Sequence, residues 1–134
     1  MSRDQFLHVG LAIALFCSCF ILYWPVRDHE FVWDTVQFVL ENPWLRDPSS
    51  EDWIAMFTQA HAANWQPLIW VSHVIDFELF GDDAGLHHLS NVFYHAINTI
   101  LVYWFIQKLL PQNSSKSIWI AFWSAFIFAV HPQH

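Results

Sequence analysis

The chain has 134 residues, of which 55% are hydrophobic and only 13% are charged. Soluble domains have about 25% charged residues, so this composition excludes an ordinary water-soluble domain. The net charge of −7, without a basic patch, excludes nucleic acid as a partner, because binding requires cations that displace counterions from phosphates. Eleven of the twelve acidic residues lie between residues 28 and 83, and apolar runs flank this segment. The pattern predicts an all-α membrane protein with one acidic loop.

Three apolar runs predict membrane-spanning helices. Residues 6–24 carry no charge, and this length is close to the roughly 20 residues that span a bilayer. No small-x-small cleavage site follows this run, so we interpret it as a signal anchor that is not removed. Two further apolar runs follow the acidic segment, with Lys108 as their one charge. We predict spans at about residues 6–24, 89–110 and 115–131, and an external loop at 25–88.

The predicted orientation of these spans depends on a small number of basic residues. Arg3 precedes the first span, and Lys108 and Lys116 flank the connection between the second and third spans. The positive-inside rule places these three residues in the cytoplasm. The acidic loop is therefore expected on the periplasmic side of a bacterial inner membrane or the luminal side of the endoplasmic reticulum.

The external loop contains signals for short interfacial helices. Ser49 or Ser50 can cap a helix whose first turn contains Glu51 and Asp52. A second, amphipathic helix is predicted to begin at Pro67, to end near Phe80 before Gly81, and to lie along the membrane surface.

Asp34 is the first candidate for chemistry. It follows the first span by about ten residues and is preceded by Phe31, Val32 and Trp33. A carboxylate held against aromatic surface at a membrane interface can have a raised pKa, which suits a general base. The alternative is an Asp that caps a short helix over residues 36–40.

A polar stripe at the start of the second span is the second candidate. His88, Asn91, His95 and Asn98 are spaced so that they share one face of a helix. Polar groups within a span are costly and face a bundle interior or a wet cavity. The stripe would either hydrogen-bond neighbouring helices or line a substrate cavity.

The histidines near the end of the chain are the third candidate. His131 and His134 could be metal ligands together with His87, His88 or a carboxylate. None of these pairs has the i,i+4 spacing of helical zinc motifs, and the Cys17–Cys19 spacing fits neither a redox motif nor a zinc site. We predict no metal and no cofactor.

Five motifs in chain order resemble one known family. They are F-V-W-D, N-P-W, W-x-P-L before a helix ending in F-G, H-H-L-x-N-x-x-x-H, and A-V-H-P-x-H. Together they resemble the N-terminal region of the transmembrane and tetratricopeptide-repeat O-mannosyltransferases, which are similar to protein O-mannosyltransferases and other GT-C glycosyltransferases. The resemblance implies an N-terminal fragment that lacks the family's downstream spans and repeats.

The resemblance also implies a reaction. Family members take a sugar, here mannose, from a polyprenyl-phosphate carrier and transfer it with inversion to a protein hydroxyl. Asp34 matches the first acid of the family's paired motif, whereas Thr35 stands where a second acid is common. The partners would be the lipid bilayer, the polyprenyl-phosphate sugar and an acceptor protein. The positions that match the substrate-binding motifs are His88, Asn91, His95, His131 and His134.

Two other functions remain open at this point. The first is a non-catalytic polytopic scaffold or assembly protein whose external loop binds a partner. The second is a histidine-rich membrane protein that binds a metal or haem. By the family comparison the fragment alone is expected to be inactive.

Overall fold

The computed structural model describes residues 3–32, 36–61, 63–111 and 114–131. Within these ranges the regular structure is helical, apart from an isolated bridge between His61 and Asn64. The chain divides into two compact units. We call residues 1–26 with 89–134 the bundle unit, and residues 27–88 the loop unit.

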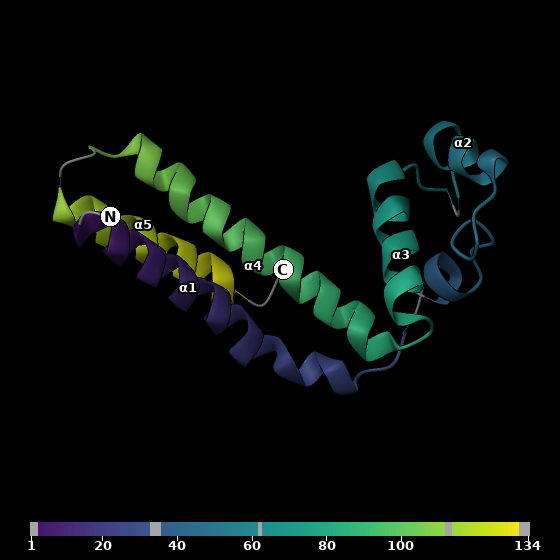
Figure 1. Cartoon of the computed structure of the whole chain (residues 1–134), viewed down its shortest axis with the longest axis horizontal. Coiled ribbons are helices and arrows are strands. Elements are labelled where there is room, and N and C mark those ends of the chain that lie inside the picture. The colour runs from purple at the N-terminus through teal and green to yellow at the C-terminus, as the bar shows by residue number, and fades with distance from the viewer. Residues whose placement is uncertain (1–2, 33–35, 62, 112–113, 132–134) are drawn as a thin grey trace. The chain divides into compact units, whose positions relative to one another are not determined.

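The bundle unit contains three helices. They are α1 (Arg3–Tyr23), α4 (Ala84–Leu109), whose first turn belongs to the loop unit, and α5 (Ser115–Val130). Helices α1 and α5 lie side by side (Figure 1). All three helices contribute to two apolar clusters, whose buried members are Leu11, Leu15, Tyr103, Ala121 and Ala125 in one, and Cys19, Val92, Ala96 and Ala129 in the other.

Small residues recur at every fourth position along α5. Ser117, Ala121, Ala125 and Ala129 are all buried, whereas the large side chain of Ile127 is 62% exposed. Small side chains on one face let neighbouring helix backbones approach closely, as in membrane helix pairs. Helix α5 therefore packs closely through its small residues, with Phe122 and Phe126 partly buried beside them and Ile127 left outside.

Among the described residues, two helical segments are long and apolar enough to cross a membrane. They are Asp4–Asp28, which joins α1 to the short 3₁₀ helix η1 (Trp24–Asp28), and Ala84–Leu109. Only 11% and 22% of their most apolar windows are buried, so neither is the core helix of a soluble domain. The prediction of an all-α membrane protein is confirmed.

The third predicted span corresponds to α5, which has 16 residues. At 1.5 Å per residue it is about 24 Å long, whereas the hydrocarbon core of a bilayer is about 30 Å thick. Helix α5 is thus an apolar helix below the usual spanning length, and its crossing of the membrane stays a prediction.

The loop unit is built from short helical elements. After η1 it contains the π-helical turn η2 (Val36–Leu40), α2 (Ser50–Thr58) and α3 (Pro67–Phe80). Its core is formed by Leu45, Met56, Trp70 and Val74.

The predicted start of α2 and both predicted ends of α3 are confirmed. Ser49 caps α2 and forms a capping box with Asp52. Helix α3 has Pro67 in its first turn, where the missing N–H removes no intrahelical bond. It ends at Gly81, whose φ of 60° and ψ of −132° lie in a region that is nearly restricted to glycine.

Helix α3 mixes polar and apolar side chains on its buried face, and its position along the membrane surface stays a prediction. Asp76 is only 3% exposed and His73 is half-buried, whereas Leu68 and Leu79 are 77% and 67% exposed. An ordinary amphipathic helix would bury the leucines and expose the acid. Helix α3 instead buries Asp76 beside the core residues Trp70 and Val74 and leaves Leu68 and Leu79 exposed.

The first turn of α4 lies close to the backbone at the end of η1. A Cβ atom added at Gly85 would be 2.0 Å from the carbonyl oxygen of Arg27. Only a glycine allows this approach without a shift of the backbone.

Candidate functional site

The predicted polar stripe of α4 divides in the structure. Asn91 and Asn98 are exposed, whereas His95 is half-buried. The His95 Nε2 atom donates a hydrogen bond to the Ala129 carbonyl at 3.0 Å, and its ring contacts that of Tyr23 edge-on with centroids 5.6 Å apart. The structure therefore does not bring the two asparagines into the packed interior beside His95.

The buried polar face of α4 continues past Asn98 instead. It consists of His95, Thr99, Tyr103 and Gln107, spaced four residues apart. Tyr103 Oη lies 2.6 Å from His8 Nδ1, and Gln107 Nε2 donates to the Ser117 carbonyl at 3.1 Å. Thr99 Oγ1 lies 3.6 Å from Cys19 Sγ.

These contacts bear on the two roles left open for the stripe. His95 and Gln107 form hydrogen bonds to α5, and Thr99 and Tyr103 contact α1. Each of these four side chains therefore joins α4 to another helix. For His95, the one member of the predicted stripe among them, the contact observed is helix–helix bonding. The substrate-binding role of the stripe stays a prediction. The four-residue spacing of these four polar side chains is present in the sequence, but it is hard to recognise among the many apolar residues of this helix.

The other candidate residues are less closely grouped. Asp34 and His134 lie outside the described residues. His131 is exposed, and its carbonyl accepts a hydrogen bond from Tyr23 Oη at 3.1 Å. His88 is half-buried, with Nε2 3.4 Å from the Glu30 carbonyl.

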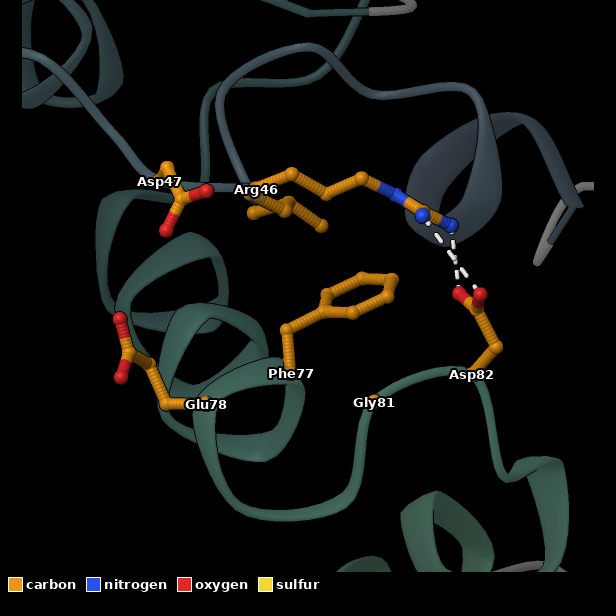
Figure 2. Close-up of a pocket in the computed structure, with 7 residues that line it drawn as sticks. Arg46, Asp47, Phe77, Glu78, Gly81 and Asp82 are labelled. Carbon is orange, nitrogen blue, oxygen red and sulfur yellow. Dashed lines mark hydrogen bonds and ion pairs between the residues drawn. The ribbon is translucent and has the colours of Figure 1, made fainter.

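A hollow of about 390 Å³ in the loop unit was not predicted (Figure 2). Arg46 crosses it, forms an ion pair with Asp82 at 2.5 Å and stacks over the Phe77 ring at 5.1 Å. Asp47 and Glu78 line the side away from this pair. Three carboxylates around one paired guanidinium make a poor phosphate site, because an incoming phosphate would be repelled.

A second unpredicted group lies at the junction of α3 and α4. His73 and Asp76 come from α3 and His87 from the first turn of α4, and one ligand-type atom from each lies within 4.8 Å of the others. Asp76 and His87 are both only 3% exposed. Burial lowers the pKa of His73, and this outweighs the opposing effect of the Asp76 carboxylate.

This group shows what sequence reasoning missed. His87 was considered as a ligand only together with His131 and His134, and it was not grouped with His73 and Asp76 of α3. Their i,i+3 spacing does place His73 and Asp76 on one helix face. The turn at Gly81 then brings His87 to that face, and only tertiary structure reveals this.

The fold and its exposed apolar helices define the class of an all-α membrane protein. Comparison with characterised proteins then points to particular relatives. The chain is 27% identical over 137 residues to protein O-mannosyl-transferase Tmtc1 of Drosophila melanogaster and 28% identical over 135 residues to TMTC1 of Mus musculus. It is 24% identical over 142 residues to TMTC3 of Mus musculus. The predicted resemblance is therefore confirmed as a distant homology.

The coverage of these similarities is unequal. They extend over 93–100% of this chain but only 14–15% of the relatives' own length. No family model matches the chain, and no solved structure matches it.

Proposed function

We propose that this chain is the N-terminal part of a membrane protein O-mannosyltransferase. One observation carries the proposal: the similarity to protein O-mannosyl-transferases extends over 93% or more of the chain. The helices long and apolar enough to cross a membrane agree with it, since an enzyme that uses a lipid-linked donor must work at a bilayer.

In this proposal the donor is mannose on a polyprenyl phosphate and the acceptor is a protein hydroxyl. Asp34 acts as the general base, because a carboxylate can take the proton of the acceptor hydroxyl as the sugar leaves its phosphate. The phosphate is bound outside the hollow around Arg46, where three carboxylates surround the one cation. The protein would act in the endoplasmic reticulum or bacterial inner membrane, with the loop unit on the luminal or periplasmic side.

Asp34→Asn tests this role. Asparagine keeps the shape of the side chain but cannot accept a proton at neutral pH. In the complete gene product, we expect Asp34→Asn to leave expression unchanged and to lower transfer from polyprenyl-phosphate mannose by about 10²–10⁴-fold, the usual contribution of a general base. The measurement is radiolabelled mannose incorporated into protein by isolated membranes.

Two acids of the same unit provide matched controls. Asp28 and Asp47 are both exposed. Asp47 has a φ of 50°, which asparagine tolerates well, so its substitution does not strain the backbone. We expect Asp28→Asn and Asp47→Asn to leave transfer within about twofold.

The controls also separate the enzyme from the scaffold. Equal effects of all three substitutions would mean that Asp34 belongs only to an acidic surface, and the scaffold would then be the better function. Transfer from a nucleotide sugar but not from polyprenyl-phosphate mannose would contradict the proposed donor.

A further inference from the structure

We propose that His73, Asp76 and His87 form a binding site for one divalent transition-metal ion, Zn²⁺ in particular. The site lies entirely within the loop unit and joins α3 to the first turn of α4. The inference does not depend on the proposed transferase activity, because it uses only the geometry of these three side chains.

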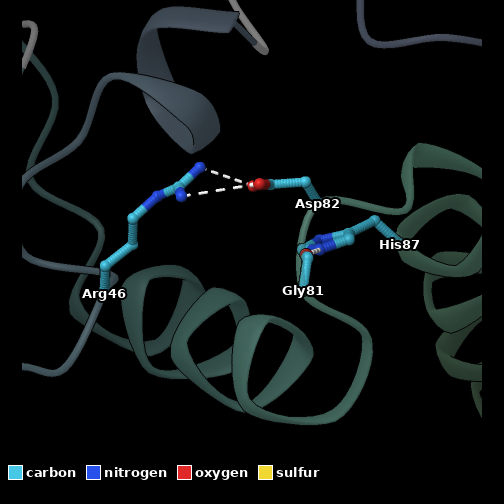
Figure 3. Close-up of polar contacts among 4 residues, drawn as sticks. All are labelled: Arg46, Gly81, Asp82 and His87. Carbon is cyan, nitrogen blue, oxygen red and sulfur yellow. Dashed lines mark hydrogen bonds and ion pairs between the residues drawn. The ribbon is translucent and has the colours of Figure 1, made fainter.

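The hydrogen bond of His87 prepares its ring for a metal. Its Nε2 atom lies 2.8 Å from the Gly81 carbonyl oxygen, and Figure 3 shows the His87 side chain extending toward Gly81. A carbonyl only accepts, so Nε2 carries the proton and Nδ1 presents a lone pair. Histidines that bind metals commonly donate their other N–H in this way, which fixes the ring and its tautomer.

The lone pairs of the two histidines are buried. The Nδ1 atoms of His73 and His87 are both shielded from solvent and have no hydrogen-bond partner. An unsatisfied buried polar atom is costly and is uncommon in native proteins. A bound cation would satisfy both nitrogens and would balance the buried carboxylate of Asp76.

The chemistry and spacing of the ligands indicate zinc. Two imidazoles and one carboxylate are the ligand set of known zinc sites, and such sites keep a fourth position for water. Ligands of this kind bind Zn²⁺ more tightly than Fe²⁺. Tetrahedral zinc with bonds of about 2.1 Å needs ligand atoms about 3.4 Å apart. One ligand-type atom of each residue already lies within 4.8 Å of the others, so the three side chains need to approach by about 1.4 Å at most.

Aromatic rings enclose the group. The rings of Phe77 and Phe31 contact His87 with centroids 5.1 and 5.3 Å apart, and the Trp70 ring lies 6.4 Å from that of His73. An apolar shell lowers the local dielectric constant and so strengthens the attraction between the ion and its ligands. The metal would therefore hold the turn between α3 and α4 in place.

Zinc binding by the purified chain in detergent tests the proposal. The protein is loaded with ZnCl₂ and dialysed against a weak chelator, and bound metal is measured by mass spectrometry. We expect one equivalent of zinc, and an affinity reduced in His73→Ala, Asp76→Asn and His87→Ala by more than the 10–100-fold that loss of an outer-shell partner costs. His61→Ala is the matched control, because His61 is half-buried in the same unit and also contacts the Trp70 ring.

A second measurement guards against variants that fail to fold. Circular dichroism of each metal-free variant should match that of the metal-free wild type. Zinc should raise the melting temperature of the wild type and of His61→Ala, but not that of Asp76→Asn.

Three outcomes would overturn the proposal. The first is less than one equivalent of zinc in the wild type. The second is zinc retained equally by all variants. The third is that Asp76→Asn lowers the melting temperature while zinc leaves the melting temperature of the wild type unchanged. That third result would make the group a hydrogen-bonded polar network.

Discussion

Ser49 and Asp52 form reciprocal hydrogen bonds at the start of α2. The Ser49 backbone N–H donates to the Asp52 carboxylate at 2.8 Å, and the Asp52 N–H donates to Ser49 Oγ at 3.2 Å. The Ser49 hydroxyl also donates to the same carboxylate at 2.6 Å. The side-chain bond, followed by the backbone bond, holds the pKa of Asp52 below its ordinary value of 3.8.

This cap should make the start of α2 sensitive to acid. A carboxyl whose pKa is lowered by folding stabilises the fold fully above about pH 3.8, and this contribution disappears as pH falls through the lower pKa of the folded state. We expect hydrogen exchange of the first-turn amides of α2, corrected for intrinsic rates, to accelerate below that pH. Ser49→Ala should accelerate it at neutral pH too and remove most of the pH dependence. Equal pH dependence in Ser49→Ala and the wild type would contradict this role.

Helix α4 depends on a single glycine in its first turn. Because a Cβ atom at Gly85 would meet the Arg27 carbonyl at 2.0 Å, Gly85→Ala must displace backbone. We expect a loss of about 1–3 kcal/mol in stability, the usual range for overpacking. Melting monitored by tryptophan fluorescence measures it.

Gly10→Ala is the control for this substitution. It is also a helical glycine, but a Cβ atom there would meet nothing within 4 Å. Alanine favours helix over glycine by roughly 0.5–1 kcal/mol, so the melting temperature should stay the same or rise. Similar losses at both positions would mean that the contact with Arg27 does not matter.

The elements differ in how far their sequence could predict them. The ends of α2 and α3 depend on Ser49, Asp52, Pro67 and Gly81, whose effects act within a turn of chain, and these ends were predicted. The burial of the Asp76 side chain depends on the tertiary neighbours of α3, and the residue pattern within one helix does not contain that information.

The same distinction applies to the candidate site. The homology was recognisable because short sequence motifs, which need no knowledge of the fold, carry it. His95 bonds to Ala129, which comes 34 residues later in the chain. His87 bonds to Gly81, which comes six residues earlier. Helical spacing alone therefore grouped His95 with Asn91, although the fold groups it with Thr99.

At the scale of the whole molecule, the positive-inside rule predicts that Ser49 and Ser115 lie on opposite sides of the membrane. Both residues are exposed, so cysteines placed there should be accessible. In a background that lacks Cys17 and Cys19, we expect an impermeant maleimide to label Ser49→Cys from the outside only. Ser115→Cys should require permeabilised membranes.

Labelling of both positions from the same side would contradict the predicted arrangement of spans. A background carrying neither new cysteine serves as the blank. Labelling of Ser49→Cys only after permeabilisation, with Ser115→Cys labelled from outside, would invert the orientation.

Three hydrogen bonds from other helices end on the backbone of α5 or of the residue that follows it. His95, Gln107 and Tyr23 donate to the carbonyls of Ala129, Ser117 and His131. Every amino acid has such a carbonyl, so these acceptors survive any substitution whose side chain still fits. The donors, in contrast, are specific side chains on α1 and α4. Over evolutionary time α5 can therefore exchange one small residue for another, while changes at the three donor positions break a bond.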